Sequence, residues 1–328
     1  MCASVAAGKR SFRLLAAPLD GYSERAFRSL MQHCGADLSY AEMTRMDSLS
    51  KNNQSSWRRI RIDPEVPSGL QLLPSDLSST ARFLEMYSLQ LQKAGVDSVS
   101  SFGVAEFQLN LGCPSGHVVD RGLGCAMMKR TSHVNKHVGL IRKFFPNVPV
   151  TLKFRLGMNS AEKEASVFRR LVNEGDADAF IVHARHGRQK SSDPADWSVF
   201  RELHDAAEAG KRIIANGDVV SVEGIAELRM RYPFLSGVMI GRMAVQNPCI
   251  FSQYREFDRS GTYTAHTLES DLLPVRRKYE EFFSKYYHND TGDTVSSAAY
   301  QKYSSSFMRH FGKHVRRDSS FSLENASG

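Results

Sequence analysis

Two kinds of hydrophobic pattern alternate along the chain. In short runs the apolar positions alternate with polar ones or follow one another without a break, which is typical of β-strands. In the longer segments between them apolar residues recur every three to four positions, which is typical of amphipathic helices. The strand-like runs span 12–21, 36–44, 67–75, 106–114, 149–157, 178–187, 211–219 and 234–242, and clear helical patterns span 23–34, 75–95 and 161–175. The segment 51–67 predicts a loop.

This alternation predicts a closed barrel. Strands separated by helical segments with short connections form a parallel sheet with helical crossovers. Eight such units favour an α/β fold of the (β/α)8 TIM barrel type over an open sheet. Past Asn247 the alternation stops, and 276–289 and 297–317 predict helices joined by a polar loop. We therefore expect a TIM-barrel catalytic domain over 1–249 and a small C-terminal all-α helical domain over 250–328.

Composition argues against several classes of protein. The hydrophobic fraction of 41% and the charged fraction of 24% are those of a globular protein, and no apolar run approaches the roughly 18 residues of a membrane helix. Five cysteines at irregular spacing argue against a disulfide framework, and no Cys/His spacing matches a structural zinc site. The N-terminus has no apolar core ahead of a cleavage site. We expect a monomeric cytoplasmic protein without membrane contact or structural metal.

The cations gather near the C-terminus. The net charge of +8 is compatible with a polyanionic partner. From residue 302 to residue 317 the chain has five cations and no carboxylate, namely Lys302, Arg309, Lys313, Arg316 and Arg317. Alone, this run is typical of a solvated helix face, and it indicates nucleic acid only if another feature does.

Polar residues or glycines stand where almost every predicted strand ends. In a TIM barrel the functional residues lie at these carboxyl ends. They are Pro18 and Asp20, Glu42 and Thr44, Gln71, Asn110 and Cys113, Lys153 and Arg155, His183 and Arg185, Asn216 and Asp218, and Gly241 and Arg242. Packing does not need such a ring, so the ring predicts an active site at the barrel mouth.

The last two strand ends predict a phosphate site. In these barrels the loops after strands seven and eight commonly bind phosphate through backbone N–H groups. Gly217 and Gly241 let the backbone approach an anion, and Arg242 can add a charge-assisted hydrogen bond. Together, ANGD and MIGR favour a phosphorylated ligand.

Lys153 lies within an apolar strand, where a buried ammonium needs an anionic partner. A reduced flavin is one candidate, because its pyrimidine edge carries negative charge. The amides of Gln71 and Asn110 can hydrogen-bond to ring edges of this kind. An ion pair with Glu42 from the second strand is the alternative, and the residues leave both open.

Cys113 follows a predicted strand and precedes a glycine-rich loop. A cysteine of the core would normally lie inside the apolar run, so the turn formers around Cys113 predict a displayed thiol on a flexible loop. Such a thiol is a candidate acid, base or nucleophile. Cys125 on the same loop is the competing thiol, whereas Cys34 and Cys249 have no polar neighbours in the sequence and are expected to pack.

Several of these segments, in this order, resemble the tRNA-dihydrouridine synthase family. They are APLDGYSERAFR, QLLPSD, NLGCPSGHVVDRGLGCAMMK, LKFRLGM, HARHGRQ, ADW, ANGDV and VMIGR, and they extend from about residue 14 to about residue 250. The family reduces the C5=C6 bond of particular uridines in tRNA, using FMN that a nicotinamide cofactor recharges. The resemblance implies an enzyme with FMN as cofactor, NADPH or NADH as reductant and tRNA as partner.

The resemblance also implies roles for individual residues. Cys113 would donate a proton to C5 of the uracil, since a thiol with an ordinary pKa of roughly 8.5 is protonated at neutral pH. FMN-binding residues of the family fall on Pro18, Leu19, Gln71, Lys153, His183, Asn216, Gly217, Asp218, Gly241 and Arg242. A uridine inside folded RNA must be flipped out while other residues hold the strand. Candidates for substrate contact are Asn110, Arg155, Arg185 and the five C-terminal cations.

One motif departs from the family pattern. Members commonly have H-x-R-T-[RK] where this chain has HARHG, with His186 and Gly187 in the last two positions, and Ser191 replaces a frequent tyrosine. We expect these changes to affect which uridine is recognised more than flavin binding. Two alternatives stay open. A flavoenzyme of the dihydroorotate dehydrogenase type would need no basic helical domain, and a non-enzymatic RNA-binding protein would need neither Lys153 nor Cys113.

Overall fold

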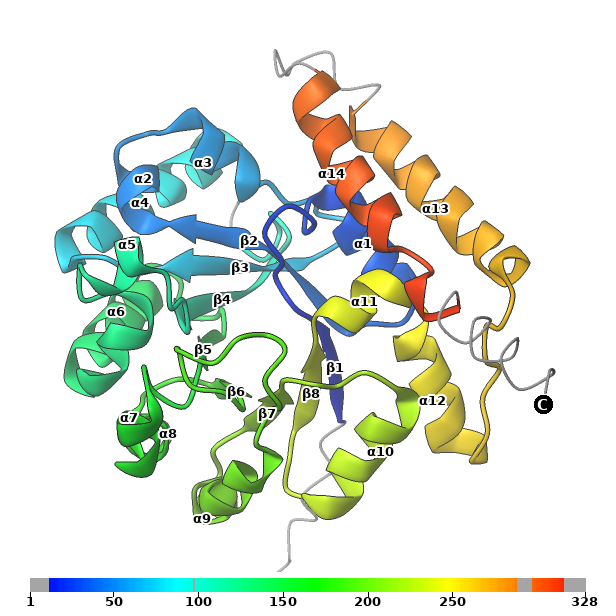
Figure 1. The fold of residues 1–328 in the computed structure, drawn as a ribbon. Helices are drawn as coiled ribbons and strands as arrows, with labels where there is room; N and C mark the ends of the chain where they lie inside the picture. The colour runs from blue at the N-terminus through cyan, green and yellow to red at the C-terminus, as the bar shows by residue number, and fades with distance from the viewer. Residues whose placement is uncertain (1–11, 97, 288–296, 316–328) are drawn as a thin grey trace, which may run out of the picture.

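The computed structural model describes residues 12–96, 98–287 and 297–315. Within these ranges eight parallel strands form one closed barrel in sequence order, and the last strand pairs with the first (Figure 1). The strands are β1 (Arg13–Ala16), β2 (Leu38–Arg45), β3 (Ser68–Leu73), β4 (Val104–Leu111), β5 (Val150–Phe154), β6 (Ala179–His183), β7 (Ile213–Asn216) and β8 (Gly237–Ile240). The predicted TIM barrel is confirmed, and every strand overlaps a predicted run.

The strand period decides which residues face the inside of the barrel. Successive side chains of a strand point to opposite faces of the sheet. A small buried cluster consists of Leu15, Ala17, Leu38, Tyr40, Ala179, Ile181, Ile214 and Met239. Their strand neighbours, such as Phe180 and Val182, belong instead to the large core between strands and helices. Continuing this period to the carboxyl ends turns Lys153, His183 and Asn216 inward, toward the barrel mouth.

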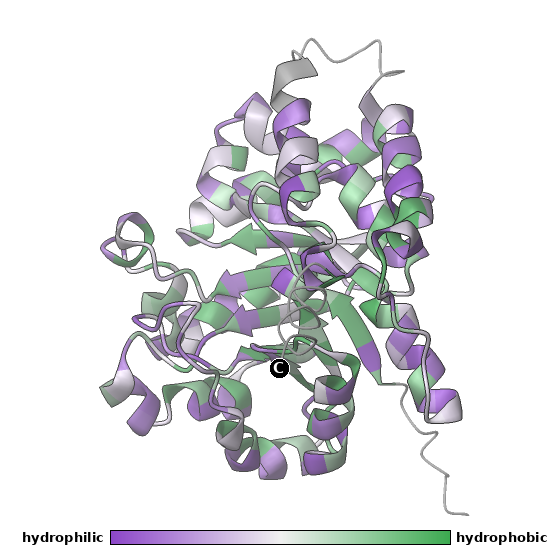
Figure 2. Ribbon diagram, turned by 45° about the vertical axis from the view of Figure 1, so that its right-hand side comes forward, coloured by the Kyte–Doolittle hydropathy of each residue, from purple (hydrophilic) through white to green (hydrophobic). Residues whose placement is uncertain are grey.

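Helices surround the barrel (Figure 1). They are α1 (Arg25–His33), α2 (Met46–Ser50), α3 (Gln54–Arg59), α4 (Leu77–Lys93), α5 (Gly116–Val119), α6 (Thr131–Phe144), α7 (Ser160–Glu164), α8 (Val167–Glu174), α9 (His204–Glu208), α10 (Val222–Arg231), α11 (Arg242–Gln246), α12 (Ile250–Ser260), α13 (Glu269–Tyr287) and α14 (Ser297–His310), with 3₁₀ turns at Gly124–Lys129 and Trp197–Leu203. Figure 2 shows the strands largely in hydrophobic colours and many helix residues in hydrophilic ones. This is the pattern expected when amphipathic helices cover an apolar barrel.

Two predictions of local structure are wrong. The segment 51–67 contains the helix α3, because the Asn53 side chain caps the Ser56 amide and Trp57 packs on two aromatic rings of α4. The single helix expected over 161–175 is divided into α7 and α8. Ser166 between them has a φ of 49°, in the left-handed region, which interrupts a right-handed helix.

The predicted C-terminal helices are present as α13 and α14, and they lie beside α1 (Figure 1). The rings of Phe27 and Phe307 have their centroids 5.8 Å apart, and the hydroxyl oxygens of Ser29 and Tyr286 are 2.9 Å apart. Among the described residues no strand follows β8. The proposed domain boundary at residues 249 and 250 stays a prediction.

The described part of the chain lacks two features, a membrane-spanning helix and a cluster of metal ligands. No helix there is both long and apolar enough to cross a membrane. No group of three or more His, Cys, Asp or Glu side chains there is arranged to hold a metal ion.

Candidate active site

A pocket of about 140 Å³ lies at the carboxyl ends of β1, β5, β7 and β8. We call it the barrel-mouth pocket. It is lined by Ala17, Pro18, Leu19, Lys153, Arg185, Asn216, Gly217, Asp218, Val219, Val220, Met239, Gly241, Arg242 and Met243. Eight of the ten residues expected to bind FMN are therefore brought together. The other two are Gln71, which lies within β3, and His183, which is the last residue of β6.

The turn after β7 has a backbone that needs glycine. Gly217 has a φ of +109°, and a Cβ there would lie 2.9 Å from Cδ2 of His183. The Asn216 side-chain amide donates to the Met239 carbonyl oxygen at 2.8 Å, which joins the ends of β7 and β8. The bare backbone of this turn therefore forms one wall of the pocket.

The pocket holds more positive than negative charge. Within the described ranges the Lys153 ammonium has no hydrogen-bond or ion-pair partner, and burial, then Arg155, lowers its pKa to about 8. Burial, then the nearby cations led by Lys153, lowers the pKa of His183 to about 2, so His183 is neutral at any physiological pH. The carboxylate of Asp218 is engaged by Arg185 and Arg242, at 2.5 and 3.3 Å. An anionic ligand would relieve this excess.

The alternative partner of Lys153 is excluded. The Glu42 carboxylate accepts hydrogen bonds from the Gly21 amide at 2.6 Å and from the Tyr303 hydroxyl at 2.9 Å, and it lies 3.7 Å from Arg59. The alternative that the sequence left open, an ion pair between Lys153 and Glu42, is therefore not the one that the structure shows.

Arg185, which was expected to contact substrate, is buried beside Asp218. Only 2% of this residue is exposed. Its guanidinium donates to both carboxylate oxygens of Asp218, at 2.5 and 2.6 Å, and to the Asp193 carbonyl oxygen at 2.7 Å. Arg185 thus holds Asp218 and the loop after β6 in place while it also lines the barrel-mouth pocket, and its contact with substrate stays a prediction.

The turn that carries Cys113 is held by Asn110. The Asn110 side-chain oxygen accepts from the amides of Gly112 and Cys113, both at 3.0 Å, and its nitrogen donates to Gln71 at 2.9 Å. Cys113 is half-buried. Asn110 was expected to contact substrate, and the contacts in the structure make it a positioning residue for the thiol.

The loop after Cys113 is more ordered than its glycines indicate. It folds into α5 and the 3₁₀ turn Gly124–Lys129. The Cys125 amide donates to the Cys113 carbonyl oxygen at 3.1 Å. Gly124 has a φ of +56°, and a Cβ there would overlap this carbonyl oxygen. This glycine permits close packing rather than flexibility.

The competing thiol is buried. Cys125 is 0% exposed, and burial raises its pKa to about 12. A thiol in that setting is a packing group. Cys34 and Cys249, expected only to pack, lie close enough for their thiols to hydrogen-bond to each other.

The remaining substrate candidates lie on two elements. Arg155, at the end of β5, donates to the carbonyl oxygens of His186 and Gln189, at 2.9 and 3.3 Å, and so shapes the loop that departs from the family pattern. On and after α14, Lys302 and Arg309 are exposed and Lys313 is half-buried. Arg316 and Arg317 lie outside the described residues.

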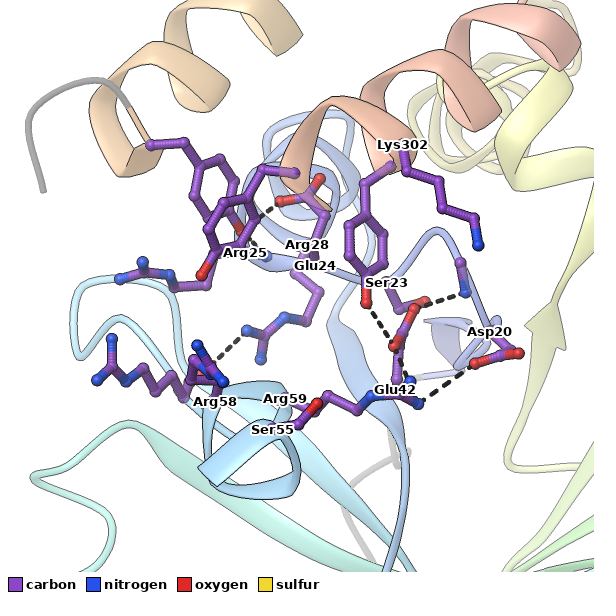
Figure 3. Close-up of a pocket in the computed structure, with 15 residues that line it drawn as sticks. Asp20, Ser23, Glu24, Arg25, Arg28, Glu42, Ser55, Arg58, Arg59 and Lys302 are labelled. Atoms are coloured by element: carbon purple, nitrogen blue, oxygen red, sulfur yellow. Dashed lines mark hydrogen bonds and ion pairs between the residues drawn. The ribbon is translucent and has the colours of Figure 1, made fainter. Parts of the chain in front are cut away.

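Sequence reasoning missed a second cavity, which lies between the barrel mouth and the C-terminal helices (Figure 3). Its lining includes Arg58, Arg59 and Arg61, from the segment that was expected to be a loop. The run WRRIR in that segment was the available signal.

Known proteins share sequence or fold with this chain. The dihydrouridine synthase family model matches residues 14–320. The tRNA-dihydrouridine synthase B of Pseudomonas putida is 28% identical over 251 residues, which cover 76% of this chain and 70% of that protein. The tRNA-dihydrouridine(47) synthase [NAD(P)(+)] of Saccharomyces cerevisiae is 25% identical over 323 residues, which cover 92% of this chain but 46% of that protein.

The solved structure of 6-hydroxypseudooxynicotine amine oxidase from Pseudomonas geniculata matches with a TM-score of 0.50. The match covers 81% of this chain and 50% of that protein, at 10% identity, and at that level it shows a shared fold only. The family model, in contrast, matches nearly the whole chain. On that evidence the chain belongs to the dihydrouridine synthase family.

Proposed function

We propose that the chain reduces the C5=C6 bond of particular uridines in tRNA to give 5,6-dihydrouridine, with FMN as cofactor and NADPH or NADH as reductant. Membership of the family and the activities for which its relatives are named support this activity. The observation that carries the proposal is the placement of an uncompensated ammonium on the strand beside the one that leads into the Cys113 turn. Lys153 is paired in register with Asn110, whose side chain holds the Cys113 turn.

The residues of the barrel-mouth pocket fit FMN by their chemistry. Lys153 and Arg242 provide positive charge for an anionic ring and a phosphate. Gly217 and Gly241 place no side chain between the backbone and a ligand. Gln71 lies outside this lining, with its amide hydrogen-bonded to Gln108 and Asn110, and we propose that the same amide also faces a polar ring edge. Bound there, FMN would supply reducing equivalents from the nicotinamide cofactor to the uracil.

Cys113 is the proposed general acid. Reduction at C6 leaves C5 of the uracil in need of a proton, and the Cys113 thiol can donate it. The Asn110 side chain accepts a hydrogen bond from the Cys113 amide and so fixes the backbone from which the thiol projects. Cys125 cannot replace it, because that thiol is fully buried.

The helices beyond the barrel are proposed to hold the RNA. The cations on and after α14 would contact phosphates while one uridine enters the barrel mouth. We further propose that a single chain is the active unit and that it acts in the cytoplasm.

Replacement of Cys113 tests the assignment. In Cys113→Ala, dihydrouridine formation on tRNA should fall by roughly two to four orders of magnitude, the usual contribution of a positioned general acid. Reduction of bound flavin by NADPH should proceed at the wild-type rate, because the thiol does not act in that step. Cys125→Ala is the matched control and should keep most of its activity. Loss of flavin reduction in Cys113→Ala would show instead that this residue shapes the cofactor site.

A further inference from the structure

The second cavity has a volume of about 400 Å³ and lies between the β1–α1 loop, the end of β2, α3 and the C-terminal helices (Figure 3). Six cationic side chains line it, namely Arg25, Arg28, Arg58, Arg59, Arg61 and Lys302. Three carboxylates line it as well, namely Asp20, Glu24 and Glu42. Among these lining side chains the cations outnumber the carboxylates by three. We call it the Arg28 pocket.

Arg28 is the most deeply buried of the six cations. It is 2% exposed, and its Nε and Nη1 have no hydrogen-bond partner among the described residues. Its Nη2 donates to the Arg61 carbonyl oxygen at 2.6 Å. A buried guanidinium with two unused nitrogens is costly, because the water that it lost is not replaced by protein acceptors.

The two buried carboxylates of the pocket are already used elsewhere. Glu24 accepts from the amides of Ala26 and Phe27, at 2.5 and 2.7 Å, and from the Tyr287 hydroxyl at 2.9 Å. Glu42 accepts from Gly21 and Tyr303, as described above. Burial raises the pKa of Glu24 to about 7, which weakens its negative charge near neutral pH, and burial also raises the pKa of Glu42. Neither carboxylate is hydrogen-bonded to Arg28.

Aromatic rings form another part of the lining. The rings of Tyr287 and Tyr300 are stacked, with centroids 3.9 Å apart and an angle of 24° between their planes. The guanidinium of Arg25 lies 5.4 Å from the centroid of the Tyr287 ring. Arginine forks beside aromatic rings are typical of sites that bind phosphate groups attached to a nucleoside.

We infer that the Arg28 pocket binds a phosphate group of a nucleotide ligand, at a site separate from the glycine-lined pocket at the ends of β7 and β8. The inference rests on the proposed function, because that function supplies the two molecules that could carry the phosphate. One is a backbone phosphodiester of the RNA, and the other is a phosphate of the nicotinamide dinucleotide. Both present the same chemistry to arginine forks, and the volume of the pocket exceeds that of one phosphate group.

The test uses flavin-loaded protein, so that the barrel-mouth pocket is filled, and inorganic pyrophosphate as the probe. The double variant Arg58→Gln, Arg59→Gln removes two charges whose side chains line the pocket without being buried, and it leaves the cations of α14 unchanged. Arg28→Met is the second variant, and its fold must be checked by circular dichroism. Arg201→Gln is the matched control, because Arg201 is exposed near the residues that lead into β8.

Calorimetric titration should show that pyrophosphate binds at least about tenfold more weakly to the double variant than to wild type, whereas Arg201→Gln binds it like wild type. A tenfold loss of tRNA affinity with a shallower salt dependence would identify the RNA as the source. A raised KM for NADPH with an unchanged KM for NADH would identify the nucleotide phosphate instead.

Equal pyrophosphate affinity in wild type and double variant overturns the inference. It is also overturned if the double variant binds both tRNA and NADPH like wild type. Failure of the proposed function has a different signature, namely wild-type protein that forms no dihydrouridine, and that result does not depend on the variants.

Discussion

Lys153 should destabilise the folded protein when no flavin is bound. Its pKa is lowered from 10.5 to about 8, and because the residue is only half-buried, the corresponding difference of about 3 kcal/mol is an upper limit. At pH 7 the ammonium is charged in both the folded and the unfolded state, so the folded state carries the full cost. In Lys153→Met the charge is removed and most of the side-chain volume is kept. We expect the free energy of unfolding of flavin-free protein to rise by up to about 3 kcal/mol, while retention of flavin falls.

The dependence on pH makes this test more specific. Because the folded-state pKa lies below the unfolded-state pKa, the unfolded state binds more protons between pH 8 and 10.5. The contribution of Lys153 to the free energy of unfolding therefore becomes more favourable as pH rises through this window. The difference between Lys153→Met and wild type should shrink accordingly in urea denaturation of flavin-free protein at pH 7, 8, 9 and 10.

Lys136→Met is the control, since Lys136 is exposed on α6 and its replacement should change stability little. The reasoning is refuted if Lys153→Met is no more stable than wild type at pH 7, or if the difference between them is the same at every pH. Either result would mean that the folded protein already compensates the ammonium, which would remove the physical reason to expect an anion beside it.

Two further changes test the other charged regions. Arg242→Ala should speed the loss of flavin on dilution, because a phosphate at Gly217 and Gly241 loses its charge-assisted partner. Arg231→Ala, at the end of α10, is the control and should retain flavin like wild type. Equal flavin retention in the two variants would refute the phosphate placement. The double variant Arg309→Glu, Lys313→Glu should bind tRNA more weakly and with less dependence on salt, as measured by filter binding across a salt series. Its flavin content should stay unchanged. Unchanged tRNA binding would locate the RNA surface elsewhere.

The barrel and much of its mouth could be predicted because both follow from the period of the strands. Lys153 alternates with Leu152 and Phe154, and the two apolar residues belong to the outer core. A residue between them must face inward. The same period turns His183 and Asn216 inward, so local pattern alone identified most residues of the barrel-mouth pocket.

The contacts that the sequence could not predict are those between distant segments. Arg185 sits in a strand-end motif that is typical of substrate contact, but its burial depends on Asp218, which lies 33 positions further along the chain. The Arg28 pocket combines the β1–α1 loop, α3 and the helices near residues 287 and 300–303. No periodicity links these segments. The helix α3 itself depends on a cap at Asn53 and on the packing of Trp57. Neither contact gives its six residues the spacing of apolar positions that predicts a helix.

Buried charges are treated differently at the two ends of the barrel. Away from the mouth, Glu106 accepts from the hydroxyls of Tyr40 and Thr151, at 2.6 and 2.7 Å, and lies 3.4 Å from Arg13. At the mouth and beside it, Lys153 has no partner and Arg28 has two unused nitrogens among the described residues. The partners of Glu106 show that this fold can pair a buried charge completely. Unpaired cations on the other side lower stability, and such local conflicts are expected where a ligand completes the structure. The pH series on Lys153 and the pyrophosphate titration therefore test the same idea at two sites, namely that an unpaired buried cation marks the place of an anionic ligand. If only one of the two tests succeeds, the idea holds for that site and fails for the other.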